Sequence, residues 1–89
     1  MNKTYIELNG RQLDVKLTLG AIEDYCDELN IKKGWEASIS ESPKNIRLFI
    51  YHLVKHNDVT KEELKDLAFS ELNKAMGVLG TGEGKAVEG

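Results

Sequence analysis

Two histidines, His52 and His56, stand four residues apart, a spacing that places two imidazoles on one face of a helix and lets them bind a metal ion. Both lie off the apolar positions Phe49, Leu53 and Val54 of the helix predicted there, on the side expected to face solvent. No cysteine or carboxylate occupies a fitting position on that face. We therefore expect two exposed histidines and no metal site.

The candidate nucleophiles are the single cysteine, Cys26, and the closely spaced serines Ser38, Ser40 and Ser42. A catalytic thiol needs exposure, a nearby base and a lowered pKa, whereas Cys26 falls on the predicted apolar stripe of a helix. The serines stand outside any nucleophile-elbow sequence. We expect Cys26 to be a core residue, and we expect neither a catalytic residue nor an enzyme.

The glycine-rich segment 80–86 is only superficially similar to a phosphate-binding loop. Leu79 stands where the motif needs its first glycine, Ala86 replaces the Ser or Thr that holds magnesium, and the flanking strand and helix are missing. We expect residues 80–89 to form a flexible tail and the chain to bind no cofactor.

Acidic residues gather on one predicted helix, as Glu23, Asp24, Asp27 and Glu28. Carboxylates in this pattern are typical of a solvated helix face. The alternative is an acidic docking surface for a basic partner helix, to which Glu23 and Asp27 would contribute.

The chain as a whole has 89 residues, with 15 acidic and 12 basic side chains and a net charge of -3. This length predicts one domain, placed at 1–79. The interspersed acidic charge argues against nucleic-acid binding, which needs a basic face. One cysteine favours a reducing compartment, and no apolar run reaches the ~20 residues of a membrane span. We expect a cytoplasmic protein that binds no membrane.

The elements that position these residues begin with a β-hairpin. Asn9-Gly10 is a strong signal for a two-residue type I′ turn. Such a turn pairs Leu8 with Arg11, and it places Ile6 opposite Leu13 with both on an apolar face. Because two strands are unstable alone in water, the hairpin must pack on helices. The predicted fold class is therefore α+β, a hairpin against a bundle of three to five helices.

Five helical segments are predicted after the hairpin, or four if the last two are continuous. In the first, Thr18 is the N-cap and Leu19, Ile22, Cys26 and Leu29 form the buried stripe. A short helix spans 34–40, and Ser42-Pro43 begins the central helix, whose stripe is Ile46, Phe49, Ile50, Leu53 and Val54. Thr60 and Glu63 make a capping box with a Val59–Leu64 staple. Ser70 caps a last helix, unless one bent helix runs from Lys61 to Leu79.

Three aromatic residues are candidates for partner contacts, since exposed aromatics are favoured interface anchors. Tyr5 projects from the polar face of the hairpin, Trp35 follows a glycine in an irregular region, and Tyr51 flanks the central stripe. For Trp35 the alternative is that the ring folds back to close one end of the core. With Glu23 and Asp27, these three complete the candidate partner-binding set.

The order of a short strand, Asn-Gly, a second strand and Leu17 to Tyr25 resembles the tail assembly chaperones of long-tailed (siphovirus-type) bacteriophages and prophages. The carrying residues include Tyr5 to Gly10, and the Ser42-Pro43 helix start and the Thr60 to Glu63 cap follow the same plan. The resemblance runs loosely from about residue 3 to about residue 79.

The resemblance implies a non-enzymatic protein of the bacterial host cytoplasm that binds the tape measure protein, helps to recruit tail tube subunits and is absent from the mature virion. Its partners would be the tape measure and tail tube proteins, bound near the first and central helices, and self-association into a homo-oligomer stays open. The alternative is a structural tail or head-tail connector subunit whose hairpin edge adds to a neighbouring sheet. A DNA-binding regulator is a third and weaker interpretation, because the central helix offers only Lys44, Arg47 and Lys55 as cations.

Overall fold

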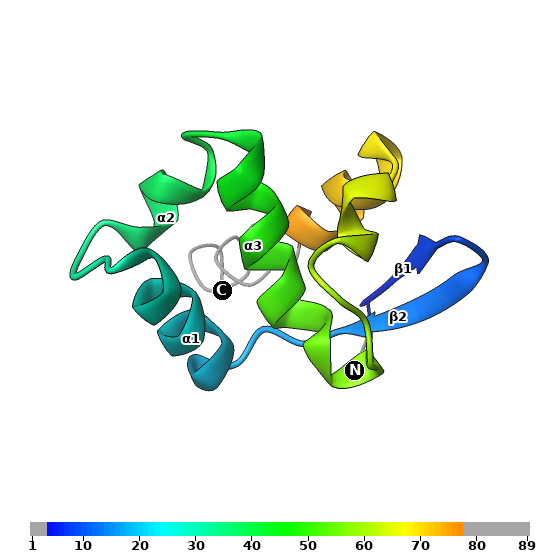
Figure 1. The fold of residues 1–89 in the computed structure, drawn as a ribbon, viewed down its shortest axis with the longest axis horizontal. Coiled ribbons are helices and arrows are strands. Elements are labelled where there is room, and N and C mark those ends of the chain that lie inside the picture. Colours follow the sequence, from blue (N-terminus) through cyan, green and yellow to red (C-terminus); the bar gives the residue numbers. More distant parts are fainter. Residues whose placement is uncertain (1–3, 78–89) are drawn as a thin grey trace, which may run out of the picture.

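The computed structural model describes residues 4–77, and its chain begins with an antiparallel hairpin of β1 (Thr4–Leu8) and β2 (Arg11–Val15) (Figure 1). Leu8 pairs with Arg11 and Ile6 with Leu13, so the predicted register is confirmed. The turn residues Asn9 and Gly10 have φ values of 51° and 84°, as a type I′ turn requires. One face of the hairpin is buried, and Tyr5 projects from the other.

The helix α1 (Leu19–Leu29) begins at the predicted N-cap, where the Thr18 hydroxyl accepts from the Ala21 N–H at 3.1 Å. The prediction of which face of this helix is buried is wrong, because the helix is rotated about its axis relative to the expected orientation. The buried residues are Ala21 and Tyr25, whereas Leu19 is 74% exposed. Ile22, Cys26 and Leu29 are only half-buried, so Cys26 lies at the border of the core instead of inside it.

Tyr25 explains the rotation of α1, because its large ring fills the space between α1 and the centre of the molecule. The ring packs edge-on against Phe49 with 5.2 Å between centroids. Its hydroxyl lies 2.9 Å from the Ser38 Oγ, which itself donates to the Trp35 carbonyl. A fully buried tyrosine with a satisfied hydroxyl determines which face of the helix points inward.

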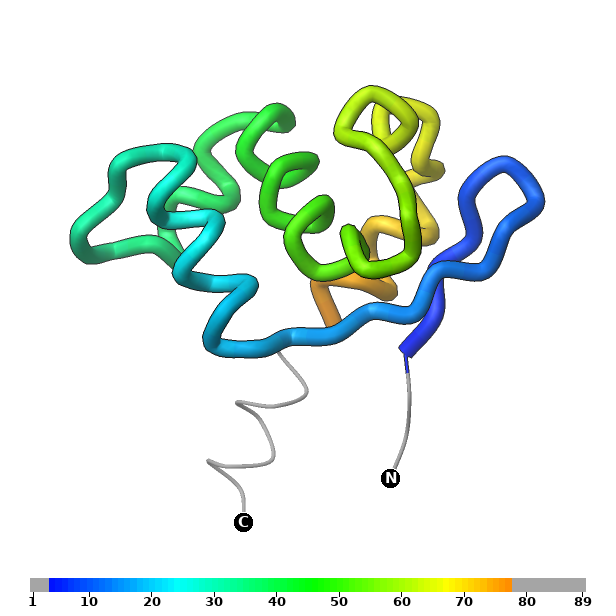
Figure 2. Tube along the Cα trace, turned by 60° about the horizontal axis from the view of Figure 1, so that its bottom comes forward, coloured from blue at the N-terminus to red at the C-terminus, as the bar shows by residue number. Residues whose placement is uncertain are grey.

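The central element is α3 (Pro43–Val54), which packs against α1, β2 and the short helix α2 (Trp35–Ile39). Figures 1 and 2 show α3 between these helices on one side and the segment 63–77 on the other. The Ser42 hydroxyl accepts from the Asn45 N–H, which confirms the predicted cap with Pro43 in the first turn. Four stripe residues are buried as predicted, Phe49, Ile50, Leu53 and Val54, while Ile46 is half-buried.

The chain beyond α3 forms short turns instead of one long helix. A 3-10 turn, Lys55–Asn57, ends at Asp58 in the left-handed conformation. The capping box then forms, with Glu63 N–H donating to the Thr60 hydroxyl at 3.1 Å and the Thr60 N–H donating to the Glu63 carboxylate at 2.8 Å. It opens only a 3-10 helix, Glu63–Asp66, because Leu67 is extended with ψ 130°.

The last helical segment covers residues 69–77. It begins two residues earlier than a cap at Ser70 predicts, because the Ala68 carbonyl accepts from the N–H groups of Glu71 and Leu72 at 3.0 Å each. Ser70 is therefore inside the helix and is not its cap. The bent helix from Lys61 to Leu79 is also wrong. The predicted tail at 80–89 lies outside the described residues.

Both outer edges of the hairpin make contacts with later segments. On β2, the Asn57 side chain accepts from the Asp14 N–H at 3.1 Å and donates to the Asp14 carbonyl at 2.8 Å. On β1, the Glu7 N–H donates to the Glu71 carboxylate at 2.8 Å. The fold is thus an α+β domain in which a hairpin is clamped from both sides by the helical part.

Candidate functional site

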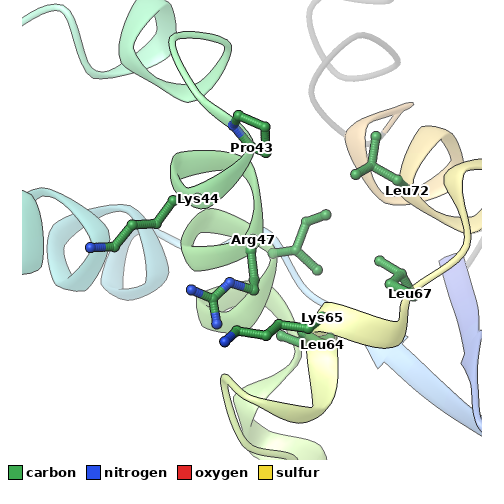
Figure 3. A pocket seen from close by; sticks show the side chains of 8 residues that line it. Pro43, Lys44, Arg47, Leu64, Lys65, Leu67 and Leu72 are labelled. Atoms are coloured by element: carbon green, nitrogen blue, oxygen red, sulfur yellow. The ribbon is translucent and has the colours of Figure 1, made fainter.

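An open groove lies between α3 and the segment that follows the capping box (Figure 3). Its volume is about 350 Å³. The floor consists of Ile50 from α3, Leu64 from the 3-10 helix, and Leu67 and Leu72 from the last turns of the described chain. Ile50 and Leu64 are buried, at 1% and 4% exposure, while Leu67 and Leu72 are half-buried. The groove therefore presents aliphatic surface over a closed core.

The rim of this groove is basic. Lys44 and Arg47 come from α3 and Lys65 comes from the 3-10 helix, and no carboxylate is among the eight lining residues. The Arg47 guanidinium donates to the Lys61 carbonyl at 3.1 Å, which holds its side chain along the groove. Lys65 pairs with Glu62 at 3.1 Å, but both side chains are largely exposed. In Figure 3 the Arg47 and Lys65 side chains extend to the same side of the groove mouth.

The backbone that builds the groove depends on the local signals at 59–68. The helix that the capping box begins ends after one turn, at Asp66. The extended Leu67 then turns the chain away from α3 before the helical segment 69–77 begins. A continuous helix would instead have laid its apolar stripe flat against α3. The break therefore separates the two sides of the groove and leaves Leu67 and Leu72 half-buried.

A polar cluster joins α1 to the end of α3 on another part of the surface. Contrary to expectation, His52 is buried, and its Nε2 lies 2.7 Å from a Glu28 carboxylate oxygen. The Lys55 ammonium lies 3.1 Å from His52 Nδ1 and also donates to Asp24. Because an ammonium can only donate, Nδ1 accepts here and the Nε2 proton points toward Glu28. His56 is exposed, as expected, with Asp14 at 3.3 Å.

The carboxylates of this cluster are held in their charged form. Burial alone would raise the pKa of Glu28, but hydrogen bonds from Lys61, at 2.5 Å, and from His52 bring it below the usual value. The hydrogen bond from Lys55 and its charge lower the pKa of Asp24. Asp24 and Glu28, two of the four acidic residues predicted to form a solvated face, therefore connect α1 to the end of α3. The sequence did not indicate this role, because their partners are distant along the chain.

The residues predicted to bind a partner are spread over the surface instead of gathered at one place. Tyr5 is 42% exposed on the outer hairpin face. Glu23 and Asp27 are exposed on α1. Trp35 is half-buried and stacks on Phe49, with centroids 5.9 Å apart. Tyr51 is half-buried beneath the Lys61 ammonium, which lies 5.4 Å from its ring centroid.

None of these five residues lines the groove. Sequence reasoning found the apolar residues of the groove but assigned them all to the core. The signal available in the sequence was weak: the aliphatic residues Leu64, Leu67 and Leu72 follow the capping box, and the basic residues Lys44, Arg47 and Lys65 lie near them in sequence or on the preceding helix.

Within residues 4–77, the histidines, cysteine and carboxylates form no group of three or more placed to hold a metal ion. In the same range, no helix has both the length and the apolar character needed to cross a membrane. Every buried side-chain polar atom in this part of the chain has a hydrogen-bond partner.

Comparisons of the chain with protein-family models, with curated proteins and with solved structures find no match.

Proposed function

We propose that this chain is a tail assembly chaperone of a long-tailed bacteriophage or prophage, which binds the tape measure protein and helps to recruit tail tube subunits in the bacterial cytoplasm. The observation that carries the proposal is the aliphatic groove between α3 and the segment 63–72. The apolar positions and the charged rim of the groove support a role in binding another protein.

The groove suits a chaperone of a long helical protein for a physical reason. An amphipathic helix exposes a stripe of large apolar side chains until it is assembled, and such stripes drive aggregation. A shallow aliphatic groove covers part of that stripe with a modest area of contact. Modest contact favours the release that assembly requires, because affinity depends on a few well-buried anchors.

The hairpin argues for the chaperone over the structural subunit. A subunit that joins neighbours by strand addition needs an unoccupied strand edge. Here Asn57 occupies the outer edge of β2 at Asp14, and Glu71 takes the Glu7 N–H on β1. The helical groove is therefore the better candidate for the partner-binding surface.

The test is co-expression of the chain with the tape measure protein encoded beside it. We expect a soluble complex that purifies together, and we expect mass spectrometry of purified virions to lack the chain. A stoichiometric amount of the chain in virions would contradict the proposal and support the structural subunit.

A pair of variants connects this test to the groove. Leu67→Glu places a charge on the groove floor, whereas Ala37→Glu adds the same charge on the exposed side of α2. We expect only Leu67→Glu to abolish co-purification, with circular dichroism showing that both variants are folded. Equal complex formation by the two variants would exclude the groove as the binding surface.

A further inference from the structure

The charge of the groove is opposite to the charge of the chain. The chain carries 15 acidic and 12 basic residues, yet three of the eight groove-lining residues are cations and none is an acid. The groove therefore carries a local excess of positive charge. This excess gives the groove a preference for partners of one sign, because complementary charge steers encounter and sets specificity.

We infer that the groove binds an amphipathic helix whose apolar stripe is flanked by aspartate and glutamate side chains. The inference rests on the proposed function and adds the chemistry of the bound segment. Large aliphatic side chains of the partner would contact Ile50, Leu67 and Leu72, and its flanking carboxylates would face the rim cations. The spacing of such anchors along a helix suits a groove floor built from separate elements.

The rim cations are available to a partner. Lys44 is exposed on the first turn of α3, and its side chain makes no ion pair with another residue in the range 4–77. The Lys65–Glu62 pair has side-chain exposures of 55% and 78%, and exchanging so exposed a pair costs little. Arg47 uses one contact on the Lys61 carbonyl, and a guanidinium has five N–H donors.

A single-stranded nucleic acid fits this surface less well than a helix. Binding of unstacked bases uses aromatic platforms beside the cations, and the groove is lined by aliphatic side chains and one proline. The aromatic residues Tyr25, Phe49 and Trp35 are instead packed with one another on the opposite side of α3. An acidic peptide helix satisfies both the aliphatic floor and the basic rim.

The experiment compares two synthetic helical peptides of about 18 residues, or five turns. They share one stripe of leucines and carry either glutamate or lysine beside it. Amide chemical shifts of the full chain are followed during titration at low salt. We expect the glutamate peptide to bind at least about tenfold more tightly, with shifts centred on Arg47, Leu67 and Leu72, and we expect added salt to weaken it.

A double charge reversal supplies the matched control. K44E/K65E changes the rim, whereas K32E/K33E makes the same change in net charge on the exposed loop before α2. We expect K44E/K65E to lower the affinity for the glutamate peptide about tenfold or more and K32E/K33E to leave it within about threefold. Equal effects of the two variants would overturn the inference. So would equal binding of the two peptides, or no binding of either at about 1 mM.

The results separate this inference from the proposed function. If the tape measure protein co-purifies with the chain and K44E/K65E behaves like K32E/K33E, the charge preference is wrong and the chaperone role stands. If the glutamate peptide binds in the groove and no tape measure protein co-purifies, the acidic-helix site stands and the chaperone role is wrong.

Discussion

Replacing Asn57 by alanine would remove the main connection between the outer edge of β2 and the end of α3. The Asn57 carboxamide accepts from the Asp14 N–H at 3.1 Å and donates at 2.8 Å to both the Asp14 and Val54 carbonyls. Alanine deletes all three bonds and leaves the backbone groups of Asp14 without this partner. The Asp14 position would then become an exposed strand edge.

The expected loss follows from the value of each bond. A neutral hydrogen bond contributes about 1 kcal/mol net, and a backbone group left without a partner costs more as it becomes more buried. For the half-buried Asn57 we expect a fall of about 2–3 kcal/mol in the free energy of unfolding. In a domain of this size that corresponds to a Tm lower by about 10–20 °C.

The assay is urea unfolding followed by the fluorescence of Trp35, the single tryptophan, which stacks on Phe49 and reports on the packing of α2 against α3. Asn73→Ala is the matched control, since Asn73 is exposed on the segment 69–77. We expect the control to stay within about 0.5 kcal/mol of the parent. If Asn57→Ala and Asn73→Ala were equally stable, the clamp would contribute nothing and the reasoning would be wrong.

Two further predictions concern pH. The pKa of Glu28 lies below its usual value of 4.5, so its carboxylate stabilises the fold above that pH, and this stabilisation is lost as the pH falls through the folded-state pKa. Glu28→Gln should therefore reduce the loss of stability at acidic pH, measured as the urea midpoint at each pH. An unchanged loss would refute the stabilisation of the Glu28 carboxylate by Lys61 and His52. Burial raises the pKa of Tyr25 above 10.0. The neutral phenol therefore contributes fully to the free energy of unfolding below pH 10, and this contribution is lost as the pH rises through the folded-state pKa. Tyr25→Phe should remove this alkaline loss while costing about 1 kcal/mol at neutral pH through the hydrogen bond to Ser38, and a variant as alkali-sensitive as the parent would contradict it.

Local sequence signals predicted the hairpin and the starts of α1 and α3 correctly, because each depends on a few adjacent residues. The Asn9-Gly10 turn determined the register, and the caps at Thr18 and Ser42 formed as expected. The phase of α1 was not predictable in this way. Its apolar residues form two overlapping stripes, and the choice between them depends on Phe49, which follows Tyr25 at a distance along the chain.

Long-range contacts account for the other differences. His52 was expected in solvent because its partner, Glu28, is 24 residues away in sequence and no periodicity reports it. The groove was missed for the same reason, since its lining residues span Pro43 to Leu72. A capping box predicts where a helix begins but not that it stops after one turn, and the extended Leu67 is what opens the groove.

The bond between the Glu7 N–H and the Glu71 carboxylate spans 64 residues and has a consequence for the order in which the chain folds as it is made. A ribosome adding about 5–20 residues per second completes β1 roughly 3–13 s before Glu71 has been synthesised. During that time the apolar face of the hairpin lacks much of its helical cover, and a two-stranded sheet does not persist alone. The bond between Glu7 and Glu71 can therefore form only after the segment 69–77 has been synthesised, later than the contacts between β2 and α3.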